Sequence, residues 1–333
     1  MELDTPLDRV AHSRVVLIGS ATHGTDEFHR ERAELTRRLI ANAGFRAVAV
    51  EGGWSDAERV DRYVCGRDDD RSADQALTDF RRFPAWMWRN TVVEEFVAWL
   101  RGHNDARPAG APAVGFYGID LDDPETPPRG ADRVDGDGRF AAERRARAIA
   151  AGDEYRRWLA HWPVHATNVR ALHMADALSA LLGHLERTGA RTRVVVWAHN
   201  GHVGDARATE LARKGERSLG QLMRQRSGTD TLLVGFTTYA GTVTAARDWE
   251  EPAEEMRLRP ARRGSYEHLL HRRGLPRQVL EPTGLPGSHL ERAIGAVYRE
   301  RDEPTVNYFS ARIGDQFDVL VHIDETHALR SLL

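Results

Sequence analysis

Three histidines of this chain stand just after short apolar runs. His23 follows the run that ends at Ile18, and His199 and His202 follow the run at 194–196. Histidine suits general acid–base catalysis, because its ordinary pKa lies close to neutral pH. If both runs are parallel strands, their carboxyl ends meet at one edge of a sheet, where open α/β sheets bind ligands. The spacing therefore predicts an active site at that edge. The alternatives are that His23 only caps the next helix and that one of the later pair is structural.

A carboxylate, Glu51, ends another apolar run, at 45–50. An ionised group at the edge of a desolvated core is costly unless it is paired. A histidine is a natural partner, because a carboxylate behind an imidazole fixes its tautomer and stabilises its cation. We therefore expect Glu51 to orient His23. The alternative is a strand-end carboxylate that pairs with a nearby arginine.

Cationic side chains could complete such a site. Arg30 and Arg32 follow His23 on a predicted helix, and Arg32 is our candidate catalytic cation. A guanidinium that faces the crevice would stabilise an oxyanion or anchor a carboxylate, whereas a solvated one would do neither. Arg170 and Asp120 are candidates for substrate binding. Asp120 closes a predicted strand, where its alternative role is a loop cap.

Three further residues are candidates for substrate binding: Ser20, Trp88 and Arg89. Ser20 lies three residues before His23, but the chain has no G-x-S-x-G elbow, so we do not predict a serine nucleophile. The block at 83–90 places two tryptophans beside an arginine. Such a block more often packs in a core, but here it could line a pocket for a large, partly apolar substrate.

No metal or other cofactor is predicted. The histidines and Glu51 offer enough donors for zinc, which remains an alternative, but no H-E-x-x-H or comparable spacing occurs. The single cysteine, Cys65, excludes an intrachain disulfide and a multi-thiolate zinc site. No base stands beside it, so it is a poor candidate for a catalytic thiol.

Composition limits the class of partner. The 333 residues carry a formal net charge of -3 from 47 basic and 50 acidic side chains, which does not favour nucleic acid. No segment approaches the ~20 apolar residues of a membrane-spanning helix. The acidic start, at 1–4, lacks the pattern of a secretory signal. We therefore expect a cytoplasmic protein with a small-molecule substrate and no membrane partner.

Hydrophobic patterning predicts an α/β fold with a central, mostly parallel sheet flanked by helices. The expected strands are 14–18, 45–50, 114–118, 194–197, 231–236 and 317–323. The expected helices are 26–43, 54–64, 91–100, 140–159, 168–185 and 219–225. Strand, helix and strand from 14 to 50 form a βαβ unit with a right-handed crossover.

One domain, 1–333, is expected, with an insertion at 121–190. The insertion begins with a loop at 121–138, which is dense in Pro, Gly and Asp. The two helices after it are expected to form a lid over the carboxyl ends of the strands.

Several segments, in order, resemble the erythromycin esterase family. They are 16–32, 50–52, 83–90, 117–120, 197–204, 235–239, 316–318 and 322–324. The resemblance implies hydrolysis of macrolide lactones by a histidine that activates water, without a covalent acyl-enzyme. It places His23 as that base and assigns family site positions to Arg32, Glu51, His199 and His202.

The chain departs from the family pattern at Ser20. The family usually has Gly-Glu-x-Thr/Ser-His-Gly, whereas this chain has a serine in place of the glutamate at residues 19–24. A hydroxyl cannot hold the charge of an imidazolium or take a proton at neutral pH. The region between Asp120 and Glu154 is also shorter than in typical relatives.

The sequence thus predicts a cofactor-free hydrolase that cleaves an ester or lactone of a small or medium natural product with histidine-activated water. The change at Ser20 motivates the alternative of a repurposed biosynthetic enzyme. Such an enzyme would use the same pocket for cyclisation, elimination or isomerisation. A ligand-binding protein without catalysis is a third reading, against which the retained His23, Glu51 and Arg32 argue.

Overall fold

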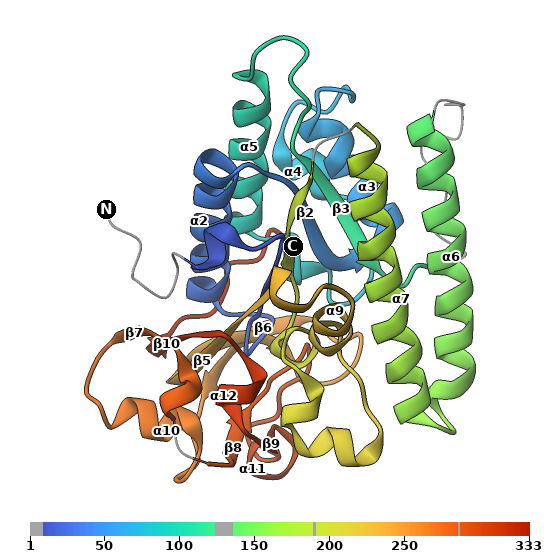
Figure 1. The fold of residues 1–333 in the computed structure, drawn as a ribbon. Helices are drawn as coiled ribbons and strands as arrows, with labels where there is room; N and C mark the ends of the chain where they lie inside the picture. The colour runs from blue at the N-terminus through green and yellow to red at the C-terminus, as the bar shows by residue number, and fades with distance from the viewer. Residues whose placement is uncertain (1–8, 124–135, 189–190, 286) are drawn as a thin grey trace.

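A mixed sheet of eight strands lies at the centre of the computed structural model, which describes residues 9–123, 136–188, 191–285 and 287–333 (Figure 1). The strand order is β3-β2-β4-β1-β5-β10-β7, and β6 pairs with β5. The strands are β1 Val15–Ile18, β2 Phe45–Gly53, β3 Gly115–Asp120, β4 Arg193–Trp197, β5 Thr231–Ala246, β6 Ala253–Leu258, β7 Arg277–Leu280 and β10 Val319–Thr326.

The six strands from β3 to β10 in this order pair in parallel, and β7 and β6 are antiparallel. The central strands are β-branched and apolar because helices cover both of their faces. All four residues of β1 are 0% exposed. The predicted fold class, a mostly parallel sheet flanked by helices, is confirmed.

Helices lie on both faces of the sheet and pack apolar side chains against it. One face carries α2 Asp26–Ala43, α3 Trp54–Val64, α4 Ala73–Leu77 and α5 Thr91–Asp105. The other carries α7 Pro163–Leu185, α8 Asn200–Val203, α9 Leu219–Ser227, α10 Tyr266–His271 and α12 Ile313–Gln316. Within the described ranges, no helix has the length and apolar character needed to cross a membrane.

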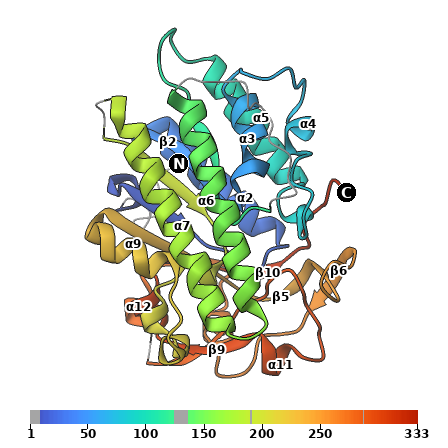
Figure 2. The same cartoon turned by 90° about the vertical axis from the view of Figure 1, so that its right-hand side faces the viewer.

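The predicted lid is a helical hairpin of α6 Gly136–Leu159 and α7, whose helices run side by side in both views (Figures 1 and 2). The apolar side chains of α7 from Ala171 to Leu182 pack on the sheet, so most of this helix forms a layer on one face. Helix α7 begins at Pro163, earlier than expected, because proline is favoured in the first helical turn. The predicted loop at 121–138 falls mostly on residues outside the described ranges.

Several elements after Phe236 were missed by the sequence analysis. Strand β7 is the last strand in the order of the main sheet, and β6 pairs with β5. A separate two-stranded ribbon consists of β8 His289–Arg292 and β9 Tyr308–Ala311. Helix α11 Glu303–Val306 lies between the strands of that ribbon. These strands are short and polar, with much of β6 exposed, so they have no apolar run. Strand β5 continues to Ala246 because its second half pairs with β6.

Candidate active site

His23 lies in the loop between β1 and α2, and distant segments hold this loop. The carbonyl oxygen of Gly24 accepts hydrogen bonds from the backbone N–H groups of Thr244, at 2.9 Å, and Leu329, at 2.9 Å. A Cβ atom at position 24 would lie 1.8 Å from the carbonyl oxygen of Thr244, so only glycine allows this contact. The loop is therefore fixed at the carboxyl end of β1.

The imidazole of His23 lies beside that of His199, with ring centroids 4.9 Å apart and planes tilted by 55°. His23 is only partly buried. Its ring nitrogens make no hydrogen bond with any residue that the structure describes. Burial lowers the pKa of His23 to about 3, against the opposing effect of Glu51. The ring is therefore neutral at neutral pH, and Glu51 is the neighbour that favours its protonated form.

Both ring nitrogens of His199 make hydrogen bonds within the protein. Nδ1 accepts from the N–H of Gly201 at 3.1 Å, so Nε2 carries the hydrogen and donates to the carbonyl oxygen of Ala21 at 3.3 Å. Burial lowers the pKa of His199 to about 4. His199 thus fits a positioning role better than that of a base.

Glu51 lies under the histidines and is 4% exposed. Its Oε2 accepts from the backbone N–H of His199 at 2.7 Å. Its Oε1 lies 3.2 Å from Nε2 of His202 and accepts from Nη2 of Arg170 at 2.8 Å. Burial raises its pKa, but His202 and Arg170 outweigh burial and hold the pKa of Glu51 well below its ordinary value. The expected partner, His23, is not hydrogen-bonded to it. Glu51 orients His202 instead. It also pairs with an arginine, Arg170, which is the alternative that the sequence leaves open.

Arg170 connects the ends of β2 and β3. From α7 it donates to Glu51, and its Nε and Nη2 donate to the two carboxylate oxygens of Asp120 at 2.9 and 2.5 Å. Burial opposes ionisation of Asp120, but Arg170 keeps the pKa of that carboxyl below its ordinary value. A bidentate pair of this kind has a defined geometry. The pair therefore fixes the α6–α7 hairpin to the site.

Arg32 lies behind the site and does not face solvent. It is 2% exposed, and its guanidinium lies over the ring of Trp197, 5.4 Å from the centroid. Its Nη2 lies 3.1 Å from Nδ1 of His29, and Nε2 of His29 lies 3.1 Å from the carbonyl oxygen of His23. Burial lowers the pKa of Arg32 to about 10, so it stays charged at neutral pH. Arg32 therefore supports the main chain of His23 through His29, where we expected an oxyanion contact.

Residues 40–132 and 122–326 match the model of the erythromycin esterase family. The chain belongs to the erythromycin esterase family. The resemblance recognised in the sequence is thus confirmed.

Three solved structures share the fold of this family member. A Bacillus cereus protein has 17% identity and a TM-score of 0.73, covering 98% of this chain and 92% of that one. A succinoglycan biosynthesis protein has 16% identity and a TM-score of 0.69, with coverage of 98% and 92%. A mutant of erythromycin esterase EreC in its open conformation has 16% identity and a TM-score of 0.65, with coverage of 98% and 95%.

The position at which this family member departs from the usual motif is buried. Ser20 is 1% exposed, and its Oγ has no hydrogen-bond partner among the described residues. Trp88 is also buried, at 3% exposure, and its Nε1 donates to the carbonyl oxygen of Glu51 at 3.1 Å. Arg89 is half-buried, and its carbonyl oxygen accepts from the N–H of Leu332 at 3.0 Å. Trp88 thus supports the main chain of Glu51.

Two further residues of α2 are Arg30, for which the sequence leaves open a site-facing or a solvated side chain, and His29. Arg30 has a side chain that is 52% exposed and pairs with Asp26, which matches the solvated alternative. His29 received no separate role in the sequence analysis, although it is 0% exposed and contacts both Arg32 and the His23 carbonyl. The helical spacing of three residues between His29 and Arg32 was the available signal.

A cavity of about 880 Å³ lies apart from the histidine cluster, beside β3 and between α3 and α6. Aromatic side chains, including Trp54, Tyr117 and Phe140, line part of it. In the described parts of the chain, no group of three or more His, Cys, Asp or Glu side chains is arranged to hold a metal ion.

Proposed function

We propose that this protein hydrolyses an ester or lactone of a small or medium natural product, with water activated by His23. Membership of the erythromycin esterase family indicates a hydrolase. The observation that carries the finer proposal is the state of His23, a neutral and partly exposed imidazole whose nitrogens are unused by the described residues. His199 and His29, by contrast, are bonded within the protein.

In the proposed reaction, the oxygen of water attacks the carbonyl carbon while His23 takes the proton of that water. His202 is the second imidazole, and its Nε2 is held by Glu51. A carboxylate in this position fixes the orientation of the imidazole, which we propose faces the oxyanion of the tetrahedral intermediate. Collapse of the intermediate breaks the bond to the leaving oxygen. That alkoxide then takes back the proton that His23 removed from water, which regenerates the neutral imidazole and leaves an acid and an alcohol.

Asp120 and Arg170 are proposed to border the substrate. Arg170 keeps 26% of its side chain exposed while it holds both carboxylates, so its position is set before any ligand arrives. Such pre-organisation lowers the cost of aligning a carbonyl with the attacking water. The family assignment favours hydrolysis over the non-hydrolytic alternative.

The test is hydrolysis across a panel of macrolide lactones, smaller lactones and aryl esters. His23→Ala should lower kcat/KM by about 10²-fold or more on any substrate that the native protein turns over. His161→Ala is the matched control, because His161 is exposed between α6 and α7. Turnover that survives His23→Ala at the native rate would remove His23 from the mechanism.

A further inference from the structure

A second cluster of buried polar side chains lies behind α8, the short helix that carries His202. It draws one side chain from each of four elements, namely α8, α10, β8 and α12. Their exposed fractions are 1% for Asn200, 0% for Glu267, 0% for Glu291 and 1% for Gln316. The amide groups of Gln316 and Asn200 face the Glu291 carboxyl group. None of these residues has a part in the proposed hydrolysis.

This cluster holds more hydrogen-bond acceptors than donors. The Gln316 and Asn200 amides lie close to the Glu291 carboxyl, but neither makes a hydrogen bond of ordinary geometry with it. Both carboxyl oxygens of Glu291, Oε2 of Glu267 and Oε1 of Gln316 therefore lack a hydrogen-bond partner among the described residues. Burying a carboxylate without a cation is strongly unfavourable. A proton on Glu291 removes the charge and converts one acceptor into a donor, for which Oε1 of Gln316 is an available acceptor. A neutral acid therefore satisfies the cluster better than a carboxylate.

Of the two glutamates, Glu267 is the one placed to keep a negative charge. Its Oε1 accepts from the backbone N–H of Arg292 at 2.9 Å. Burial raises the pKa of Glu267 as well, but the charge of the buried Arg292 guanidinium opposes this effect, and no cation of the described residues opposes it at Glu291. Glu291 faces the Glu267 carboxyl from α10 and uncharged amides from α8 and α12. Burial and the neighbouring Glu267 raise the pKa of Glu291 well above its ordinary value.

The two amides that face Glu291 stand at opposite ends of α8. Asn200 is the first residue of this helix, and its side chain also bonds the backbone of Phe236, donating to O at 2.7 Å and accepting from N at 3.2 Å. Gln316 packs against Gly204, directly after the helix. A Cβ atom on Gly204 would lie 2.7 Å from Nε2 of Gln316.

We propose that Glu291 is a positioning residue of the active site, a neutral buried acid that fixes both ends of the helix carrying His202. Its effect on turnover rests on the proposed function, whereas its protonation and its effect on the histidines do not. Through Asn200 it acts on the residue next to His199, and through Gln316 it acts on the end of α8.

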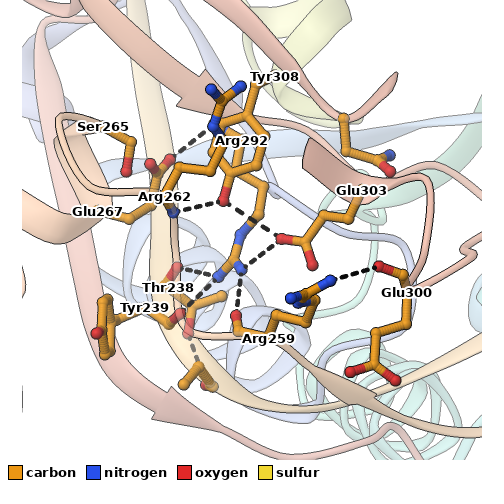
Figure 3. A network of polar contacts seen from close by, with 12 residues as sticks. Thr238, Tyr239, Arg259, Arg262, Ser265, Glu267, Arg292, Glu300, Glu303 and Tyr308 are labelled. Carbon is orange, nitrogen blue, oxygen red and sulfur yellow. Dashed lines mark hydrogen bonds and ion pairs between the residues drawn. The ribbon is translucent and has the colours of Figure 1, made fainter. Parts of the chain in front are cut away.

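The protonation state is tested without substrate, by comparing Glu291→Gln with Glu303→Gln. Glu303 is a matched control, because it is 2% exposed but pairs with a cation, its Oε1 lying 3.0 Å from Nη1 of Arg292 (Figure 3). Its Oε2 accepts from the hydroxyl of Tyr298 at 2.6 Å. Glu303→Gln should destabilise the protein at every pH. Glu291→Gln should fold with near-native stability near pH 5.

The pH dependence of Glu291→Gln follows from the raised pKa. The ordinary pKa of a glutamate is 4.5. Above this pH the unfolded chain releases the Glu291 proton, while the folded chain retains it. The native protein should therefore lose stability relative to Glu291→Gln as pH rises, by up to about tenfold in the unfolding equilibrium constant per pH unit. Infrared spectroscopy should show a carbonyl band of a protonated buried acid in the native protein and in Glu303→Gln, and its loss in Glu291→Gln.

Positioning is tested with ¹⁵N NMR of the imidazoles and with kinetics. Glu291→Ala, with Glu291→Leu as a second variant that fills more of the space, should shift the signals of His199 and His202, whereas Glu291→Gln should leave them in place. On a substrate found in the hydrolysis panel, Glu291→Ala should lower kcat about tenfold with KM unchanged, and Glu291→Gln should stay within about threefold of native.

Three results would overturn the proposal. The first is a loss of stability in Glu291→Gln equal to that of Glu303→Gln at every pH. The second is a stoichiometric cation that the native protein binds and Glu291→Gln does not. The third is unchanged imidazole signals of His199 and His202 in Glu291→Ala and Glu291→Leu. If the infrared and NMR results agree with expectation but no ester is cleaved, the proposed hydrolysis fails and the positioning role stands.

Discussion

Nε2 of His202 and Oε1 of Glu51 lie 3.2 Å apart at the carboxyl edge of the sheet. The same carboxylate oxygen accepts from Arg170, and its companion accepts from the backbone of His199. One buried carboxylate thus sets the positions of three neighbours. The imidazole of His23 has no such hydrogen bond among the described residues. His202 is thus oriented by a carboxylate, whereas His23 is not.

Replacing Glu51 by Gln should lower both activity and stability. Gln offers one acceptor oxygen where Glu51 offers two and carries no charge beside His202, so kcat/KM should fall on the order of a hundredfold. Arg170 would lose Glu51 and keep only Asp120 of the two carboxylates that it pairs with. Because this buried ion-pair network is broken, the free energy of unfolding should fall by about 3 kcal/mol. Steady-state kinetics and urea unfolding measure the two effects. Glu34→Gln is the control, because the Glu34 side chain is 50% exposed. A Glu51→Gln enzyme with native kcat/KM would contradict the proposed pairing.

Stability should fall as the pH drops below 6.5. The folded pKa values of His23 and His199 are lowered to about 3 and about 4, below the ordinary 6.5. Between these limits the unfolded chain binds protons that the folded chain does not, so acid favours unfolding. Each histidine contributes at most about 1.4 kcal/mol per pH unit. Unfolding free energies from pH 4 to 7 should show a smaller slope for His23→Ala than for the native protein, and an equal slope would argue against the lowered pKa.

Arg170→Lys should impair the site although it keeps the charge. A lysine ammonium cannot reproduce the forked contact that Arg170 makes with Asp120 and Glu51. We expect kcat/KM to fall about tenfold or more, by loss of alignment between α7 and the strand ends. Arg157→Lys, on the exposed side of α6, is the control and should match the native enzyme. Equal kinetics for both variants would show that the bridge does not serve catalysis.

Ser20→Ala should change little. The Ser20 hydroxyl is buried and has no hydrogen-bond partner among the described residues, so its loss leaves no partner unpaired. We expect kcat/KM within about twofold of native and unfolding that is unchanged or slightly more stable. A tenfold fall in kcat/KM would instead show that the hydroxyl contacts the substrate and would restore the predicted binding role of Ser20.

Much of the sheet could be predicted because its signals are local. The β-branched run of β1, the glycine that ends α2 and the apolar run of β2 each identify an element without reference to the rest of the chain. The position of the site followed from the same information, since parallel strands end at one edge. Short polar strands such as β6 have no comparable pattern, because only pairing with β5 makes them strands.

The contacts inside the site could not be predicted from these signals. Glu51 could have paired with any of three histidines, and the choice of His202 depends on how β4 and α8 lie beside β2. His29 was within reach of the sequence, since it shares the buried face of α2 with Phe28, Arg32 and Leu35. Glu291 was not, because its neighbours come from three other elements and none is close in sequence.

The two hydrogen bonds received by the Gly24 carbonyl couple the proposed base to the completion of folding. Its donors, Thr244 and Leu329, belong to the last third of the chain, whereas the segment β1–α2–β2 that carries His23 ends at residue 53. Strand β4, at 193–197, lies between β1 and β2 in the sheet. A nascent or truncated chain that ends before Thr244 holds the imidazole on a loop that lacks both of these hydrogen bonds. Catalytic competence should therefore arise late in folding, when β10 and the segment after it have docked.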